Sequence, residues 1–361
     1  MGAETKIQWA NETFNCWRGC TKISTGCKNC YASVGAGRNR KVLGVWGPNG
    51  TRVLAAESYW KQPLAWDRKA AKAGERHRVF CASYADVFED WPGPVHDHRG
   101  QQVFRYRKPQ EAETGQPGQV NRWWTTYPVG PDGGMLDLLT LDEVRRRLFT
   151  LIARTPHLDY LLLTKRPEYM RAFLARLSFD RTDDNQVYAR LDRSGTWDEE
   201  PLKNVWLGVS VEDQTRADER IPLMLDTPAA VRFLSVEPML GPIEFSNATR
   251  RADAVSQLGK KALDGIDWVI GGGESGDGAR PCKVEWLRSV VRQCQAVQVP
   301  VFVKQLGSNP EGDEFPEVET DPATGTRELH VRQSLTITDP KGGAIEEFPD
   351  DLKVREFPRV S

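Results

Sequence analysis

Residues 140–167 read TLDEVRRRLFTLIARTPHLDYLLLTKRP and carry the clearest information on the fold class. The apolar residues at 141, 144, 148 and 151 lie on one face of a helix, and Thr140 with Glu143 forms a capping box at its start. Residues 158–164 then form a nearly continuous apolar strand, which is typical of a strand covered on both faces in a parallel sheet. Pro167 suits the first turn of a following helix. The stretch predicts a helix at 140–155, a strand, and a second helix.

The same alternation of apolar strands and amphipathic helices extends over most of the chain. We expect strands at 79–83, 205–211, 232–238, 267–273 and 299–305, a helix at 284–297, and a short first strand at Lys6–Trp9. This α/β pattern predicts a complete or partial parallel β/α barrel of the TIM type, with an open doubly wound sheet as the alternative. The barrel domain is expected to cover residues 1–307, with a polar insertion at 92–135, and an acidic C-terminal extension covers 308–361.

Charge is distributed unevenly along the 361 residues, although the formal net charge is only −1. Residues 1–80 contain 14 Lys or Arg and 5 Asp or Glu, whereas residues 308–361 contain 6 and 13. The basic first part predicts an anionic partner. No apolar run in the sequence approaches the ~20 residues of a membrane span, and the N-terminus lacks the apolar core of a signal peptide. We therefore expect a cytoplasmic protein without a membrane partner.

Four of the seven cysteines lie close together, at positions 16, 20, 27 and 30. Clustered cysteines in a reducing compartment indicate a metal site rather than disulfides. One interpretation is a zinc site of all four thiolates, and another is an iron–sulfur cluster bound by the last three. Three thiolates leave one iron open, as a catalytic metal site requires. The third interpretation, reduced structural cysteines, suits isolated cysteines better than this Gly-containing loop with basic neighbours.

The stretch CTKISTGCKNCYA at residues 20–32 resembles the three-cysteine motif of a family of uncharacterised phage and bacterial radical-SAM-like proteins. Further stretches resemble that family in chain order: LLLTKRPEYM (161–170), NVWLGVSVEDQ (204–214), RFLSVEPMLGPI (232–243), IDWVIGGGESGDGARP (266–281) and VFVKQLG (301–307). The resemblance implies a radical SAM barrel in which Cys20, Cys27 and Cys30 bind a [4Fe-4S] cluster. It further implies S-adenosyl-L-methionine at the open iron, and an external electron donor for its reductive cleavage.

The motif departs from that of common radical SAM enzymes in its spacing and in one neighbour. The cysteines here are spaced C-x6-C-x2-C, whereas those enzymes have C-x3-C-x2-C. An aromatic residue usually precedes the last cysteine, but here that residue is Asn29, and Tyr31 follows instead. Similar proteins have proline at the position of Cys16, so Cys16 is not expected to be a ligand.

Polar residues follow every predicted strand, and β/α barrels place their chemistry at that end of the strands. Carboxylates there suit the ammonium and ribose hydroxyls of S-adenosyl-L-methionine, lysines suit its carboxylate, and glycines let the backbone approach. The expected cofactor-binding residues are Ser83, Asp86, Lys165, Ser210, Glu212, Glu237, Gly272, Gly273, Glu274 and Lys304. Cys282 lies just beyond them and is expected to be incidental, with a redox or hydrogen-donor role as the alternative. No catalytic residue is assigned.

The first 80 residues combine their basic side chains with nine aromatic ones, including Trp9, Trp17, Trp46, Trp60 and Trp66. Basic grooves with aromatic side chains hold single-stranded or flipped bases, so a nucleic acid is the expected substrate, modified or repaired by radical chemistry. The alternative function is a zinc-stabilised nucleic-acid-binding protein without catalysis, with Cys16 as the fourth ligand. A third interpretation is a barrel without catalysis that serves a protein partner.

Overall fold

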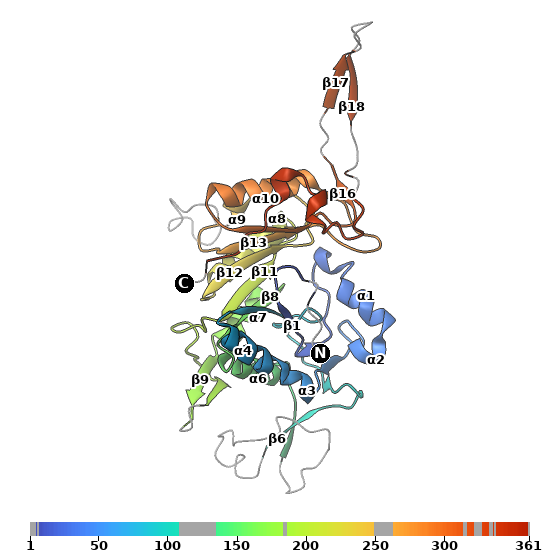
Figure 1. Cartoon of the computed structure of the whole chain (residues 1–361). Helices are drawn as coiled ribbons and strands as arrows, with labels where there is room; N and C mark the ends of the chain where they lie inside the picture. The colour runs from blue at the N-terminus through green and yellow to red at the C-terminus, as the bar shows by residue number, and fades with distance from the viewer. Residues whose placement is uncertain are drawn as a thin grey trace. The chain divides into compact units, whose positions relative to one another are not determined.

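The computed structural model describes residues 5, 7–107, 135–182, 186–248, 263–312, 316–320, 327–331, 335 and 337–359. The described residues form an α/β fold whose main sheet is shown in Figure 1. Its strands are neighbours in the order β1 (Glu12–Phe14), β4 (His77–Cys81), β8 (Leu158–Thr164), β11 (Val205–Ser210), β12 (Val231–Val236), β13 (Trp268–Gly272) and β15 (Val301–Gln305).

The order of these strands distinguishes between the two predicted architectures. A doubly wound sheet reverses its strand order at a switch point, whereas a β/α barrel adds each new strand beside the preceding one. Here the order follows the chain from β1 to β15 without reversal, and the pairs β1–β4, β4–β8, β12–β13 and β13–β15 are parallel. The sheet is therefore that of a partial parallel β/α barrel, and the doubly wound alternative is wrong.

The chain divides into two compact units by the contacts among its residues. Unit 1 contains Met1–Ile23, Ala32–Leu207 and Thr227–Ala230, and unit 2 contains Ser24–Tyr31, Gly208–Asp226 and Val231–Ser361. β1, β4 and β8 belong to unit 1, while β12, β13 and β15 belong to unit 2. The domain boundary expected at residue 307 stays a prediction.

Unit 1 contains the helix and strand that were clearest in the sequence. Thr140 caps α6 (Leu141–Ala153), since its Oγ1 accepts a hydrogen bond of 3.3 Å from the backbone N of Glu143. α6 buries Val144 and Leu148, as its apolar spacing predicts. The other described elements are α1 (Tyr31–Arg38), α2 (Arg40–Leu43), α3 (Glu57–Trp60), α4 (Gln62–Ala73), α7 (Pro167–Leu174), β2 (Trp17–Arg18), β3 (Arg52–Leu54), β5 (Val95–His96), β6 (Phe104–Arg107), β7 (Met135–Leu138), β9 (Leu177–Arg181) and β10 (Val187–Leu191).

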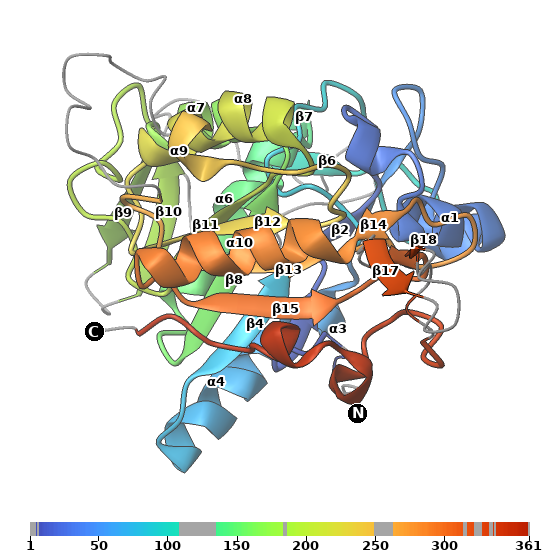
Figure 2. The same ribbon diagram turned by 90° about the horizontal axis from the view of Figure 1, so that it is seen from above.

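In unit 2, α10 (Val284–Ala296) packs on β13 and β15 through its apolar side, which includes the buried Leu287 and Val291 (Figure 2). The remaining described elements are η1 (Thr25–Cys27), α8 (Gln214–Leu225), α9 (Phe245–Ala248), β14 (Cys282–Lys283), β16 (Pro310–Glu311), β17 (Pro316–Thr320), β18 (Arg327–Val331), η2 (Ile345–Glu347) and η3 (Asp350–Leu352).

The C-terminal segment lies along β15 in unit 2. The backbone N of Val303 donates to the carbonyl of Val354 at 2.9 Å, and the N of Glu356 donates to the carbonyl of Val301 at 3.0 Å. Phe357 packs against the rings of Trp268 and Phe302, with centroid distances of 5.6 and 5.4 Å. An edge strand left open exposes unpaired backbone groups. Residues 352–357 cover that edge.

One expectation from the sequence differs from the structure. The strand predicted at Lys6–Trp9 is wrong over its described residues 7–9, because Gln8 and Trp9 form a turn and Trp9 packs at 4.7 Å on the ring of Phe80; Lys6 lies outside the described residues. In the polar insertion, β6 pairs antiparallel with β7, whereas residues 108–134 lie outside the described residues. In the part of the chain that the structure describes, no helix is long and apolar enough to cross a membrane.

Candidate functional site

The cysteines of the motif differ from the other four in exposure. All seven are free thiols; Cys20, Cys27 and Cys30 are partly exposed, whereas Cys16, Cys81, Cys282 and Cys294 are buried. The boundary between the units falls within the motif, since residues 1–23 belong to unit 1 and 24–31 to unit 2. The motif therefore has two parts, each fixed by side chains of its own unit.

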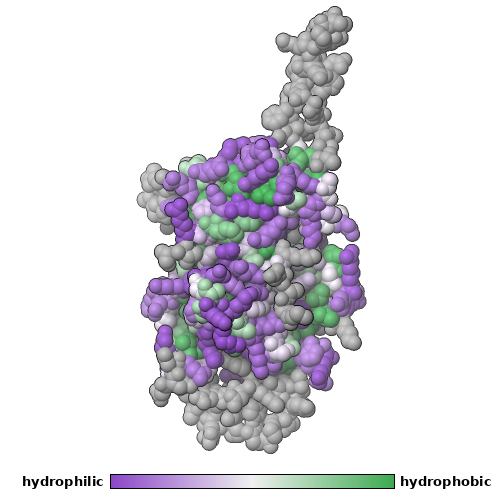
Figure 3. Space-filling model, viewed as in Figure 1, coloured by the Kyte–Doolittle hydropathy of each residue, from purple (hydrophilic) through white to green (hydrophobic). Residues whose placement is uncertain are grey.

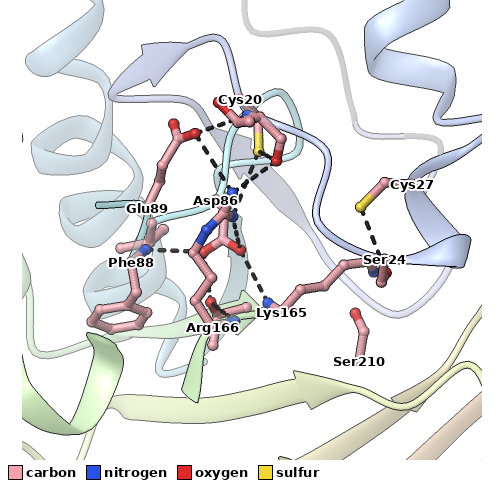
Figure 4. Close-up of polar contacts among 12 residues, drawn as sticks. Cys20, Ser24, Cys27, Asp86, Phe88, Glu89, Lys165, Arg166 and Ser210 are labelled. Carbon is pink, nitrogen blue, oxygen red and sulfur yellow. Dashed lines mark hydrogen bonds and ion pairs between the residues drawn. The ribbon is translucent and has the colours of Figure 1, made fainter. Parts of the chain in front are cut away.

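Arg166 fixes the first part of the motif in unit 1. It lies between the end of β8 and the start of α7, and its Nη1 is 3.8 Å from the Sγ of Cys20. The same guanidinium donates to the carbonyl of Thr21 at 2.7 Å and to Asp86 at 2.9 Å, as Figure 4 shows for Cys20 and Asp86. Burial, with Glu89 and Asp86 nearby, raises the pKa of the Cys20 thiol to about 12 against the opposing effect of Arg166.

A second buried pair holds the same segment. Arg52 is 0% and Glu89 is 2% exposed, and the guanidinium binds both carboxylate oxygens at 2.6 and 2.7 Å. Glu89 also accepts a hydrogen bond from the backbone N of Thr21 at 2.8 Å, while Arg52 donates to the hydroxyl of Thr21 at 2.8 Å. The residue after Cys20 is thus bound by two buried charges of opposite sign, which fixes its backbone.

The carboxylate of Asp86 accepts its hydrogen bonds from residues of unit 1. It accepts hydrogen bonds from the Thr164 hydroxyl at 2.6 Å, from the backbone N of Lys165 at 3.0 Å and from that of Phe88 at 3.0 Å, besides the contact with Arg166. Ser83 exchanges hydrogen bonds with Asn15. These residues lie after β4 and β8 as expected, but the side chains of Ser83 and Asp86 have protein partners.

The second part of the motif is anchored to Glu212 in unit 2. Glu212 is 0% exposed and binds Arg220 at 2.9 Å. Its other oxygen accepts a hydrogen bond from the Ser24 hydroxyl at 2.9 Å. Gly26 lies so close that a Cβ there would be 2.3 Å from a Glu212 oxygen. Only glycine lets the loop lie on this carboxylate.

Glu274 forms the other anchor. It is 6% exposed and binds the guanidinium of Arg280 at 2.6 and 2.9 Å. Asn29 donates to the same carboxylate at 2.9 Å, and Arg280 donates to the carbonyl of Thr25 at 2.8 Å. Burial alone would raise the pKa of Glu274, but the hydrogen bonds from Arg280 and Asn29 lower it below its ordinary value. Asn29 is therefore an anchor of the loop.

The remaining residues expected at the cofactor fall into three groups. Glu237 and Lys304 form an ion pair. Gly272 packs on Gln305 of β15, and Gly273 packs on the chain that follows β15, because a Cβ on Gly273 would lie 2.1 Å from the carbonyl oxygen of Leu306. Ser210 is 1% exposed, and its hydroxyl has no hydrogen-bond partner among the described residues. Of this set, Ser210 is the buried side chain with unused hydrogen-bonding capacity.

Sequence reasoning missed the side chains that hold the loop. Arg52, Glu89, Arg220, Arg280 and Asn29 were not expected at the site. The sequence did indicate a role for Arg280, since it lies in the GGGESGDGARP stretch that carries part of the resemblance. It gave no indication for Glu89 and Arg52, because their ion pair joins residues 37 positions apart.

The other four cysteines are buried within their units. Cys16 and Cys81 are both 0% exposed in unit 1, and burial with the contact to Cys16 raises the pKa of the Cys81 thiol. Cys282 is 1% exposed in unit 2, and burial raises its pKa to about 12. No group of three or more His, Cys, Asp or Glu side chains among the described residues is arranged to hold a metal ion.

Gly26→Ala is expected to loosen the second part of the motif, because the new methyl group collides with Glu212. The alkylation rates of Cys27 and Cys30 by iodoacetamide, followed by mass spectrometry, should rise at least about threefold. The control is Gly37→Ala, since a Cβ at Gly37 meets nothing within 4 Å. Unchanged alkylation of both thiols in Gly26→Ala would show that Glu212 does not hold the loop.

Glu274→Gln is expected to destabilise the protein in a pH-dependent way. The folded-state pKa of Glu274 lies below its ordinary value of 4.5, so its stabilising contribution is complete above 4.5 and is lost as pH falls through the folded value. Urea denaturation should therefore show a difference between wild type and variant at pH 7 that shrinks below pH ~4.5. The exposed Glu200→Gln serves as the control. A difference independent of pH contradicts the ion-pair role.

Comparison with known proteins assigns the chain to a family. A family model described as "Protein of unknown function (DUF5131)" matches residues 4–114 and 134–336. No curated protein and no solved structure matched the chain. The matched residues include the three motif cysteines together with Arg166, and both carboxylates that anchor the loop in unit 2. Since the match covers most of its length, the chain belongs to the DUF5131 family.

Proposed function

We propose that this protein is a radical-SAM-like iron–sulfur enzyme in which Cys20, Cys27 and Cys30 bind a [4Fe-4S] cluster. The observation that supports the proposal is the contrast among the cysteines: all seven are free thiols, but these three are partly exposed, whereas the other four are buried. Hydrogen bonds connect their loop to buried ion pairs before and after Ile23, from Thr21 to Glu89 and from Ser24 to Glu212. Such contacts are expected of a loop whose side chains must be positioned for chemistry.

The donor set fits an iron–sulfur cluster in its chemistry. Three thiolates at short spacing bind such clusters and leave one iron for a further ligand. Bound to S-adenosyl-L-methionine, a reduced cluster supplies the electron that starts radical chemistry. Because metal binding commonly completes the geometry of its own site, the proposal requires that the three thiols are drawn together on loading.

Arg166 has a role in this proposal that follows from its contacts. Its Nη1 lies 3.8 Å from the Cys20 sulfur, and its buried positive charge faces the site of a thiolate. A donor at this position offsets the negative charge of a ligating sulfur, which is one of the means by which proteins tune clusters. Asp86 in turn orients Arg166.

The contacts within the protein limit which side chains are available to bind S-adenosyl-L-methionine. Asp86, Glu212 and Glu274 each bind an arginine and a further protein group, so their carboxylates serve the loop and its supports. At the end of β11, the hydroxyl of Ser210 has no hydrogen-bond partner in the part of the chain that the structure describes. We infer that Ser210 donates a hydrogen bond to the cofactor, and we propose the half-buried Lys165 for its carboxylate on the sign of its charge.

A nucleic-acid substrate is the narrower form of the proposal. The excess of basic residues in the first 80 positions supports it. The expected stacking residues support it in part, because Trp9, Trp17 and Trp60 are at most 4% exposed and belong to the core, whereas Trp46 and Trp66 are partly exposed. An external electron donor is required in either case, since reduction needs an electron from outside the chain.

The zinc-binding alternative needs Cys16 as a fourth ligand. Cys16 is 0% exposed in unit 1 and lies beside Cys81. A zinc ligand there would have to leave its buried position beside Cys81. The radical-SAM-like proposal uses the partly exposed cysteines alone and is therefore favoured.

Metal analysis after anaerobic purification tests the proposal. Wild-type protein is expected to contain about four irons and four sulfides per chain and to be brown. Cys27→Ser should lose most of the iron, because a ligand is removed, whereas Cys16→Ser should retain it as the matched control. One zinc per chain and no iron after anaerobic reconstitution would overturn the proposal, and loss of that zinc in Cys16→Ser would establish the alternative.

Ser210→Ala is expected to weaken binding of S-adenosyl-L-methionine to the iron-loaded protein about 3- to 10-fold, the effect of losing one hydrogen bond. Isothermal titration calorimetry measures this, with the iron content determined in parallel. Ser58→Ala, at an exposed position of α3, is the control. Equal affinities in wild type and Ser210→Ala would remove Ser210 from the site without affecting the cluster.

A further inference from the structure

Residues 337–357 pack along unit 2, where the last of them cover the edge of β15 (Figure 2). Phe348 is 4% and Leu352 is 0% exposed, and Asp351 pairs with Arg288 of α10 at 2.6 Å. Figure 3 shows mainly hydrophilic residues on the visible surface around α10, with smaller hydrophobic areas between them. This segment therefore buries apolar side chains in unit 2 and has a fixed position there.

A tight turn lies at residues 339–343, near the start of this segment. Asp339 accepts hydrogen bonds from the backbone N of Lys341 at 3.2 Å and from that of Gly343 at 2.6 Å. The backbone N of Gly342 donates to the carbonyl of Asp339 at 2.8 Å. Aspartate commonly closes turns in this way, because its carboxylate accepts hydrogen bonds from the backbone a few residues further on. We call residues 339–343 the C-terminal turn.

The C-terminal turn packs on the chain that follows β15. The carbonyl of Gly342 accepts a hydrogen bond from the backbone N of Leu306 at 2.7 Å, and the carbonyl of Pro340 accepts one from the hydroxyl of Ser308 at 2.5 Å. Gly342 has a φ of +61°, and a Cβ there would lie 2.3 Å from the carbonyl oxygen of Gly307. Only glycine lets the turn lie this close.

Ser308 connects the C-terminal turn to the loop that follows β13. Its hydroxyl, which donates to Pro340, accepts a hydrogen bond from the backbone N of Gly276 at 2.9 Å. Its backbone N donates to the carbonyl of Glu274 at 2.8 Å. A serine hydroxyl can donate and accept at the same time, so one side chain serves both partners. The turn and the loop after β13 are thus joined through Ser308.

The loop after β13 in turn holds the second part of the motif. Besides its contact with Glu274, the amide of Asn29 donates to the carbonyl of Gly278 at 2.9 Å. Arg280 binds the Glu274 carboxylate and donates to the carbonyl of Thr25 at 2.8 Å. All these residues belong to unit 2. A continuous series of contacts therefore leads from the C-terminal turn to the second part of the motif.

We propose that the C-terminal turn is a latch that positions the thiols of Cys27 and Cys30, with Ser308 as the positioning residue between them. This inference rests on the proposed function only where it treats the two thiols as cluster ligands. While the turn is docked, Ser308 holds the backbone of Glu274 and Gly276, and the loop keeps its contacts with the motif. When the turn or the hydroxyl is lost, the loop is held by fewer hydrogen bonds and the two thiols move more freely.

Alkylation of individual thiols in the full-length, iron-free protein, followed by mass spectrometry, tests the latch. Ser308→Ala and Asp339→Ala should each raise the rates of Cys27 and Cys30 with iodoacetamide at least about threefold, because hydrogen bonds that hold the loop are lost. Ser308→Thr keeps the hydroxyl and should retain the wild-type rates. Asp350→Ala removes an exposed carboxylate elsewhere in the same segment and is the matched control for Asp339→Ala. Unchanged rates of Cys27 and Cys30 in Ser308→Ala overturn the proposal.

Two other thiols distinguish positioning from a general loss of stability. Cys294 is 0% exposed in unit 2, and Cys20 belongs to unit 1. Both should keep their wild-type rates in the two alanine variants, because the latch acts on the second part of the motif. If Cys294 reacts faster together with Cys27 and Cys30, unit 2 has loosened as a whole and the latch proposal is wrong.

The double variant Ser308→Ala/Asp339→Ala tests whether the contacts form one series. Its alkylation rates should not exceed those of the faster single variant, because both substitutions release the same loop. Increases that multiply in the double variant would show that Asp339 acts independently of Ser308, and they would contradict the latch.

The iron-loaded protein separates failure of the latch from failure of the proposed function. Ser308→Ala should release iron to a chelator about threefold faster than wild type, whereas Ser308→Thr should release it at the wild-type rate. Equal release from Ser308→Ala and wild type contradicts the latch at the loaded site. If wild type binds no iron, the proposed function fails, while the alkylation rates still decide whether the turn positions the thiols.

Discussion

Buried carboxylates paired with arginines are the interactions on which the candidate site depends. Such acids follow the strands of the sheet in both units, and each has an arginine: Asp86 with Arg166, Glu89 with Arg52, Glu212 with Arg220, and Glu274 with Arg280. A buried charge is costly unless it is paired and fully hydrogen-bonded. In every pair, one partner uses its remaining hydrogen-bonding capacity on the cysteine motif or on the residues next to it. The loop and the ion pairs therefore stabilise one another.

These ion pairs change the interpretation of the polar residues at the ends of the strands. Carboxylates at the end of β/α strands are the natural candidates for ligand binding, and the sequence offers them after nearly every strand. In the structure, Glu212 and Glu274 bind the loop that carries Cys27 and Cys30. Their hydrogen bonds hold the loop beside these two thiols. Among the residues proposed for S-adenosyl-L-methionine, Ser210 is distinguished by a hydroxyl without a hydrogen-bond partner among the described residues.

Local patterns predicted the elements well, and long-range pairing limited the prediction of the site. The helix from Leu141 and the strand at 158–164 follow from apolar spacing and from a capping box, both of which act within a few residues. The predicted strand at Lys6–Trp9 fails because Trp9 turns to pack on Phe80, a contact made with a distant strand. Likewise, the hydrogen bond between Ser24 and Glu212 joins residues 188 positions apart. Residue type alone does not distinguish a carboxylate that binds a cofactor from one that anchors a loop.

The segment that covers β15 has a consequence for the order in which the protein is completed during synthesis. β15 ends at Gln305, but its edge is covered by residues 352–357, which leave the ribosome later. At 5–20 residues per second, the edge stays open for roughly 2–10 s while the intervening residues are made. During that interval β15 offers unpaired backbone to other nascent chains. Unit 2 thus reaches its protected form only when residues 352–357 have been translated and paired.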